Sequence, residues 1–295
     1  MSDRRQWTLP ARREPARLDF LLPETPSMVA VRSRGEVRLG FAHRAGRTRA
    51  YETFQSGCLR ARMVTAPAEA PCAVLLNTSG GLTGGDRLSQ SARWRDGAAA
   101  CVTTQAAEKI YRALAEPALI ETSLDVDDHC AAEWLPQETI VFDRARLSRR
   151  VNVRLTAQSS FLAIEALVFG RAAMDERMNS GEIRDAWRIH RDGRLIFAET
   201  LHLQGAVDQH LQRKAIGDGA RASAIIIHAA PDAASRLDRL RDAFEDAQGR
   251  CVASAWSELL VARLLAPDGE TLRADALTAL NIIRDGKDMP RVWAC

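Results

Sequence analysis

IRDAWRIHRDGRLIFAE, residues 183–199, is the stretch that indicates the fold most directly. Apolar residues at 183, 187, 189, 195 and 197 are in phase on one face, which is the period of a half-buried strand. Asp192-Gly193 lies between the two halves and is a preferred two-residue turn of a β-hairpin. The stretch therefore predicts two antiparallel strands joined by a tight turn.

Short apolar runs of this kind recur along the chain, with turn signals such as Asp96-Gly97 and Asp268-Gly269 between them. They lie at 72–76, 99–104, 118–126, 151–155, 161–168 and 224–228. We find no internal repeat and no alternating rhythm of strand and helix. The sequence therefore predicts a mainly β chain, a single large body of many short strands in stacked or coiled, β-helix-like sheets.

Two segments have a different period, with apolar residues at three- and four-residue steps. They are 232–247, with Asp232 as a candidate N-cap, and 271–284, which ends before Asp285-Gly286. We expect both to be amphipathic α-helices that cover a sheet.

Composition and charge exclude several classes of protein. The 295 residues include 41 basic and 38 acidic ones, a net charge of +3 that is too balanced for a nucleic-acid-binding surface. No apolar run approaches a membrane span, and the first residues lack the apolar core of a signal peptide. We expect a soluble, cytoplasmic protein. Arginines concentrate near the start, so residues 1–35 are predicted to be a flexible basic extension and 36–295 the mainly β domain.

Cysteines and histidines show no spacing typical of a metal site. The six cysteines contain no C-x-x-C pair, and the six histidines contain no H-E-x-x-H or H-x-H motif. The length and the missing secretion signal favour reduced thiols over disulfides. A tight, preformed metal site is therefore not predicted.

NTSGGLTGGDRL, residues 77–88, follows the apolar run 72–76 and contains two glycine pairs. A phosphate-binding loop of the Walker type would end in Gly-Lys-Ser/Thr, whereas this stretch ends in Gly-Asp-Arg. The dinucleotide fingerprint G-x-G-x-x-G is also absent. The chemistry favours a rigid glycine corner between two strands, formed by the structural motif Gly80, Gly81, Gly84, Gly85 and Asp86.

Three carboxylates lie in or beside apolar runs: Glu138, Asp143 and Glu165. A buried carboxylate is unfavourable unless it is paired, hydrated or protonated. Arg171, Arg144 and Arg146 are candidate partners of Glu165. Two interpretations stay open: a buried ion pair that sets the strand register, or a polar, water-lined path through an apolar body.

Five segments together resemble the UreD (UreH) family of urease accessory proteins. They are NTSGGLTGGDRL at 77–88, TTQAAEKIYR at 103–112, EWLPQETIVFD at 133–143, FLAIEALVFGRAAM at 161–174 and PRVWAC at 290–295. The resemblance runs from about residue 46 to the last residue. Ser79 stands where many members have proline, and Ala113 where a serine is common.

The resemblance implies a protein that catalyses no covalent reaction and helps to mature the nickel centre of urease. Such a protein is a scaffold or conduit between apo-urease, the adaptor UreF and, through it, the GTPase UreG. Nickel would be bound only transiently, with no tightly bound cofactor, and GTP would belong to UreG.

The resemblance also suggests roles for particular residues. Glu138, Asp143 and Glu165 would form a weak nickel path, since an ion in transit must also leave each site. Tyr111, Arg112, Arg291 and Trp293 are candidates for partner binding, with core packing as an alternative for Trp293.

Two other classes of function remain as alternatives. One is a β-rich protein-interaction domain unrelated to nickel. The other is a hydrolase that uses Asp86 or Glu165 with a histidine, although no nucleophile elbow or triad spacing supports it.

Overall fold

The computed structural model describes residues 32–64, 70–171 and 174–294. Arg32–Cys295 make one compact unit. The predicted basic extension lies outside the described residues up to position 31, and Arg34 already belongs to the first strand. The terminal Cys295 also lies outside them.

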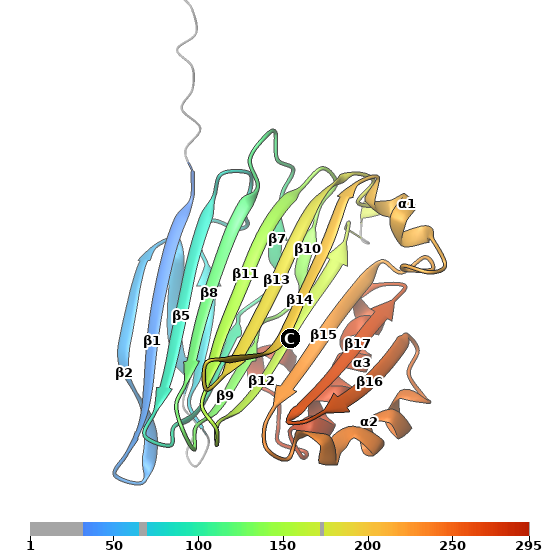
Figure 1. Cartoon of the computed structure of the whole chain (residues 1–295). Coiled ribbons are helices and arrows are strands. Elements are labelled where there is room, and N and C mark those ends of the chain that lie inside the picture. Colours follow the sequence, from blue (N-terminus) through green and yellow to red (C-terminus); the bar gives the residue numbers. More distant parts are fainter. Residues whose placement is uncertain (1–31, 65–69, 172–173, 295) are drawn as a thin grey trace, which may run out of the picture. The chain divides into compact units, whose positions relative to one another are not determined.

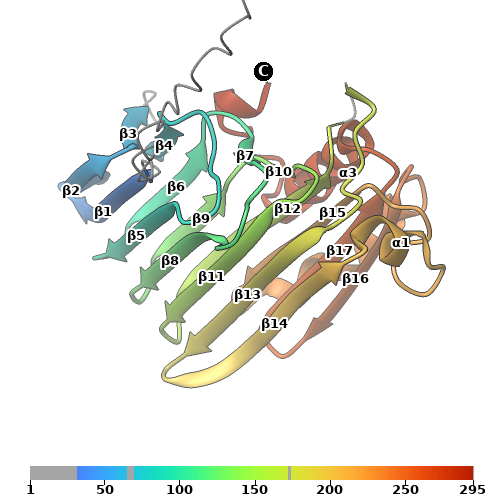
Figure 2. The same cartoon turned by 90° about the horizontal axis from the view of Figure 1, so that it is seen from above.

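Two sheets form this unit, and Figure 2 shows them as two layers. The first has seven strands in the order β14-β13-β11-β8-β5-β1-β2, so its colours run from blue to yellow across neighbouring strands in Figure 1. Its strands are β1 (Arg34–Arg44), β2 (Arg47–Gly57), β5 (Arg87–Arg95), β8 (Ala118–Val126), β11 (Arg146–Leu155), β13 (Gly181–Arg191) and β14 (Arg194–Gly205).

The second sheet has ten strands, with the main order β16-β17-β15-β12-β9-β6-β4-β3 and with β10 and β7 attached beside β12. Its strands are β3 (Leu59–Val64), β4 (Cys72–Asn77), β6 (Ala99–Thr104), β7 (Glu108–Ile110), β9 (Ala131–Leu135), β10 (Thr139–Val141), β12 (Ser160–Phe169), β15 (Ala222–Ala229), β16 (Arg250–Trp256) and β17 (Leu259–Ala266).

The chain passes from one sheet to the other as it moves along both. From β5 to β13 it visits the seven-stranded and the ten-stranded sheet in turn, and neighbours within each sheet are parallel: β5, β8, β11 and β13 in one, β6, β9 and β12 in the other. Antiparallel hairpins close both ends of this run, β1–β2 at the start and β13–β14 at the end. The predicted β-helix-like arrangement of coiled sheets is confirmed.

Each coil also has a short third side. Ile110, Val141 and Phe169 lie in parallel register on β7, β10 and β12, and Leu82 forms a parallel bridge to Ile110. All four are buried. They are roughly 30 residues apart, a spacing typical of solenoids. The coils thus repeat in the structure although the sequence shows no internal repeat, because they share positions of buried residues rather than a common motif.

Two hydrophobic clusters fill the unit. The larger one lies between the sheets and includes Phe41, Trp94 and Phe161. The smaller one lies on the other face of the ten-stranded sheet, where it is covered by α2 (Leu237–Phe244) and α3 (Gly269–Ile283). The central strands β12, β15 and β17 of the ten-stranded sheet are therefore buried on both faces. Its strand β12 reads accordingly as one continuous apolar run interrupted by Glu165.

The hairpin at 183–199 forms as predicted, with one difference. Asp192 and Gly193 have positive φ of 50° and 77°, as a twisted two-residue turn requires. A register shift follows Ile189, so that Ile189 pairs with Phe197 while His190 pairs with Leu195. Leu195 is consequently exposed rather than in phase with Phe197. The irregular pairing rotates it to the outer face.

Both predicted helices are present, and the described residues contain a third, α1 (Val207–Gln212), that was not predicted. Asp232 does not cap the first of them with its side chain; it forms an ion pair with Arg236. The N-cap of α3 is Asp268, whose carboxylate accepts a hydrogen bond of 2.7 Å from the amide of Thr271. Among the described residues, no helix is long and apolar enough to span a membrane.

Candidate functional site

The glycine-rich loop forms the corner between β4 and β5. Asp86 is buried and accepts hydrogen bonds of 2.7 Å from the amide of Thr83 within the loop and from the amide of Ser33 just before β1, so both of its carboxylate oxygens have backbone partners. Gly81 has a φ of +144°, and a Cβ there would lie 2.8 Å from the carbonyl oxygen of Lys109. The loop therefore packs directly on the next coil, which only glycine permits.

Polar side chains face the space between the two sheets, on successive coils. We call these side chains the polar row: Asn77, Glu108, Thr139, Arg149, Glu165 and Asp185. Glu108 pairs in register with Thr139, and Thr139 with the buried Leu167, so these positions share the inward face. Asn77 donates a hydrogen bond of 3.1 Å to the carboxylate of Glu108.

Arg149 is the centre of the polar row and is 5% exposed. Its Nε and Nη2 donate to both carboxylate oxygens of Asp185, at 3.1 and 2.6 Å. Its Nη1 donates to Oγ1 of Thr139 at 3.1 Å and lies 2.6 Å from Oε1 of Glu165. The guanidinium of Arg149 thus contacts two buried carboxyl groups, one from each sheet.

The electrostatics of the polar row follow from this excess of carboxylates. Burial raises the pKa of Glu165 to about 8; the guanidinium of Arg149 opposes this shift and Asp185 adds to it. Burial likewise raises the pKa of Glu108, against the hydrogen bond from Asn77. With a pKa of about 8, Glu165 is therefore mostly protonated at neutral pH.

The protonation of Glu165 predicts a pH dependence of stability. Between its ordinary pKa of 4.5 and about 8, the folded chain holds a proton that the unfolded chain has lost. The contribution of Glu165 to the free energy of unfolding is thus fully present below pH 4.5 and is lost as the pH rises to about 8. The slope is at most about 1.4 kcal/mol per pH unit. Glu165→Gln should remove this slope in urea unfolding measured across the range. An unchanged slope would contradict the assignment.

The structure does not bring the three sequence-predicted carboxylates together. Glu138 faces the opposite side of the sheet from Glu165 and pairs with Arg273 of α3 at 3.3 Å. Asp143 lies in the turn after β10 and accepts a hydrogen bond of 2.9 Å from the amide of Ser180. The side-chain alternation of a strand explains the separation, since Glu138 and Thr139 are neighbours.

The arginines expected beside Glu165 pair elsewhere, so that prediction is wrong. Arg171 pairs with Glu176, Arg146 with Glu182 and Arg144 with Asp143. The actual partner is Arg149, which is close in space because β11 and β12 face each other across the interior. The expected arginines lie near Glu165 or near the other carboxylates in the sequence, but the residues that contact a buried carboxylate are set by the packing of the sheets.

Part of the polar row can be recognised from the sequence, because two of its charged residues stand at inward positions of alternating strands. Asp185 is in phase with the buried Ile183 and Trp187, and Arg149 is in phase with Leu147 and Val151. A charged residue at an inward position of an alternating strand indicates a buried ion pair. Glu108 lacks such a signal, because β7 is only three residues long.

The four candidates for partner binding have different environments. Tyr111 is partly exposed, and its hydroxyl donates to the carbonyl of Gly80 at 3.0 Å. Arg112 and Arg291 have exposed side chains. Trp293 is buried, and its Nε1 donates to Oγ1 of Thr103 and to the carbonyl of Leu135. Trp293 thus takes the core role that the sequence left open.

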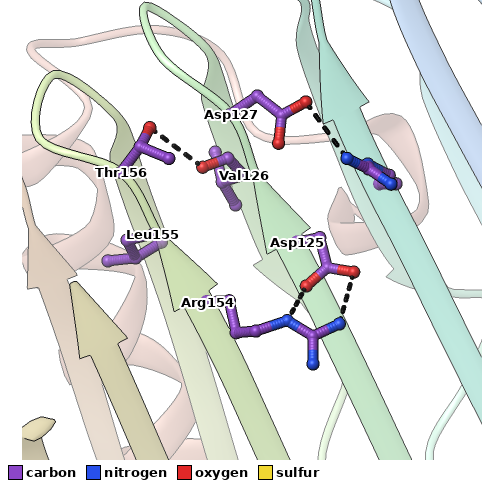
Figure 3. A pocket seen from close by; sticks show the side chains of 7 residues that line it. Asp125, Val126, Asp127, Arg154, Leu155 and Thr156 are labelled. Atoms are coloured by element: carbon purple, nitrogen blue, oxygen red, sulfur yellow. Dashed lines mark hydrogen bonds and ion pairs between the residues drawn. The ribbon is translucent and has the colours of Figure 1, made fainter. Parts of the chain in front are cut away.

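A hollow of about 190 Å³ lies on the outer face of the seven-stranded sheet (Figure 3). Its charged groups are already paired: Arg154 binds both oxygens of Asp125, and Arg93 lies 3.5 Å from Asp127. It is smaller than usual sites for small molecules. Within the described residues, no three histidine, cysteine or acidic side chains are grouped so as to hold a metal ion.

The fold and the site together define a class of protein: stacked β-coils whose interior carries a buried row of charged and polar side chains. The chain belongs to the UreD urease accessory protein family, whose model matches residues 33–294. The match covers both sheets and the helices α1 to α3.

Curated relatives agree with the family. A protein of Azorhizobium caulinodans named urease accessory protein UreD is 44% identical over 263 residues, which is 89% of this chain and 97% of the relative. A protein of the same name from Methylobacterium is 47% identical over 268 residues, 89% of this chain and 95% of the relative. In Bradyrhizobium, urease accessory protein UreD 3 is 40% identical over 266 residues, 90% and 94% of the two chains.

Proposed function

We propose that this protein helps to load nickel into apo-urease, as a non-enzymatic scaffold and conduit that works with the adaptor UreF and the GTPase UreG. Family membership supports the link to urease. The observation that carries the conduit is the polar row, which continues from coil to coil inside an otherwise apolar body.

The chemistry of the polar row suits an ion in transit better than one in store. Carboxylates attract a hydrated divalent cation, but here they are few and share the interior with the cation Arg149. A nickel ion would have to displace the proton of Glu165 and would be repelled by the guanidinium. Binding would therefore be weak, which allows the ion to move on.

Glu108 and Glu165 are the interior carboxylates assigned to this path. Glu138 and Asp143 stay in the proposal as partly exposed acidic groups that lie outside the polar row. The cargo is nickel, and no tightly bound cofactor is part of the proposal. GTP hydrolysis would belong to UreG.

The first experiment measures urease activity and nickel per urease in cells with the urease genes, after deletion and restoration of this gene. Both should be lost together and recovered together. Full nickel loading without the gene would instead favour a β-rich interaction domain unrelated to nickel.

The second experiment tests the path itself. Glu108→Gln, Glu165→Gln, Glu138→Gln and Asp143→Asn, singly and combined, should lower nickel per urease severalfold while the complex with UreF still assembles. Glu121→Gln is the matched control, because Glu121 lies on the outer face with a side chain 69% exposed and should leave loading unchanged. Normal loading in the combined variant would overturn the conduit.

A further inference from the structure

Two cysteines lie side by side on the helix-covered face of the ten-stranded sheet. Cys72 begins β4 and pairs in parallel register with Cys101 of β6. The amide of Cys101 donates a hydrogen bond of 3.0 Å to the carbonyl of Pro71, which holds the two strands together at this point. In-register residues of neighbouring strands point to the same face, and their Cα atoms are about 4.8 Å apart. This separation is within the range that a disulfide spans.

The surroundings of the two thiols differ. Cys72 is partly exposed, while Cys101 is buried. The next strand adds Glu133 in register with Cys101, and Arg284 at the end of α3 binds both oxygens of Glu133 at 2.9 and 3.1 Å. One cation and one anion thus lie beside the cysteine pair.

These surroundings separate the acidities of the two thiols. The contact with Cys101 lowers the pKa of Cys72, and Arg284 lowers it too, while burial and Glu133 act in the opposite direction. The same contact, together with burial, raises the pKa of Cys101 well above its ordinary value. The accessible thiol is therefore the more acidic one, and the protected thiol stays protonated beside it. An accessible, acidic thiol next to a second cysteine is the usual arrangement of redox-reactive cysteines.

We propose that Cys72 and Cys101 are a peroxide-reactive dithiol, in which Cys72 is oxidised by hydrogen peroxide and Cys101 closes a disulfide between β4 and β6. In the first step, the Cys72 thiolate attacks one peroxide oxygen, the O–O bond breaks, and the departing hydroxide takes up a proton to become water. Cys72 is then a sulfenic acid. In the second step, the sulfur of Cys101 attacks the sulfur of Cys72, and the S–O bond breaks. The hydroxyl leaves with the Cys101 proton as water, so that two electrons have passed from the thiols to the peroxide.

The position of this disulfide would matter to the rest of the molecule. β4 leads directly into the glycine-rich loop, and β6 leads to Glu108 of the polar row. The C-terminal segment also passes here, since Arg284 donates to the carbonyls of Lys287 and Asp288. Cys72 and Met289 pack against the same hydrophobic cluster. The bond would add a covalent link between two strands that are paired through backbone hydrogen bonds.

The test treats the full chain with hydrogen peroxide, blocks the remaining thiols and digests it with trypsin without reduction. Cys72 and Cys101 fall in different tryptic peptides, 63–87 and 96–109, because arginines follow at 87, 93 and 95. The expected product is these two peptides joined, with the intact chain lighter by two hydrogen atoms and the link removed by dithiothreitol. Peroxide that oxidises Cys58, Cys130 or Cys251 first, or that takes Cys72 to sulfinic acid without a link, would overturn the proposal.

Variants identify the role of each thiol. Cys72→Ser should reduce the linked peptide to background, and Cys101→Ser should leave a sulfenic acid on Cys72 that a dimedone reagent captures. Cys130→Ser is the matched control, because Cys130 is buried in the other cluster and its loss should leave the link unchanged. If Cys101→Ser fails to fold, the same dimedone labelling of Cys72 is measured in Cys101→Ala. Absence of dimedone labelling at Cys72 in a folded variant counts against the proposal.

Discussion

Arg149→Met should lower the free energy of unfolding by about 3–5 kcal/mol at neutral pH. The substitution removes the only positive charge that contacts both Asp185 and Glu165 among the described residues. Asp185 would be left as a buried carboxylate without its two charge-assisted hydrogen bonds, and Thr139 would lose a donor. Urea unfolding followed by circular dichroism measures the loss.

Arg154→Met is the matched control for this prediction. Arg154 lies on the same strand, β11, and also binds both oxygens of one carboxylate, that of Asp125 (Figure 3). Its side chain is 73% exposed, against 5% for Arg149, so the solvent screens the pair. The expected loss is below about 1 kcal/mol. Equal losses in the two variants would mean that burial does not govern the strength of these pairs.

A triple variant distinguishes the effect of the buried charges on stability from their effect on nickel loading. Replacing Arg149, Asp185 and Glu165 together by apolar residues of similar size should recover most of the stability, since buried ion pairs rarely stabilise more than good packing does. If the polar row serves nickel transfer, this stable variant should still fail to load urease. Loading at the normal level would show that the charges have a structural role alone.

Trp293→Ala should cost about 3–5 kcal/mol, as for other buried tryptophans. The indole is 5% exposed, donates to Thr103 and Leu135, and lies 4.9 Å below the guanidinium of Arg273. Its loss would empty a part of the cluster beneath α3 and detach the short helical turn Arg291–Ala294. Urea unfolding should show the destabilisation, and trypsin should cleave faster after Lys287.

Trp256→Ala is the control for Trp293. Trp256 lies at the end of β16 and is 42% exposed, so its removal should change stability by no more than about 1 kcal/mol. If Trp293→Ala changed neither the unfolding midpoint nor the cleavage rate, the C-terminal segment would not be held by this side chain.

Local patterns in the sequence determined the strands and their turns. The alternation around Trp187 and the Asp192-Gly193 pair predicted a hairpin that forms, because strand period and turn chemistry are properties of neighbouring residues. The glycine corner after β4 follows from the same kind of information. The family motifs also lie in a single sequence and needed no structure to be read.

Only the tertiary structure decided how the strands are joined and which charges meet. Leu82, Ile110, Val141 and Phe169 share one side of the coils because parallel pairing sets segments far apart in sequence into register. The packing of the two sheets brings Arg149 of β11 to Glu165 of β12, and the alternation of side chains turns Glu138 away from it. Backbone hydrogen bonds between distant strands leave no local trace in the sequence, whereas the solvation of a buried charge depends on the side chains that those bonds bring near.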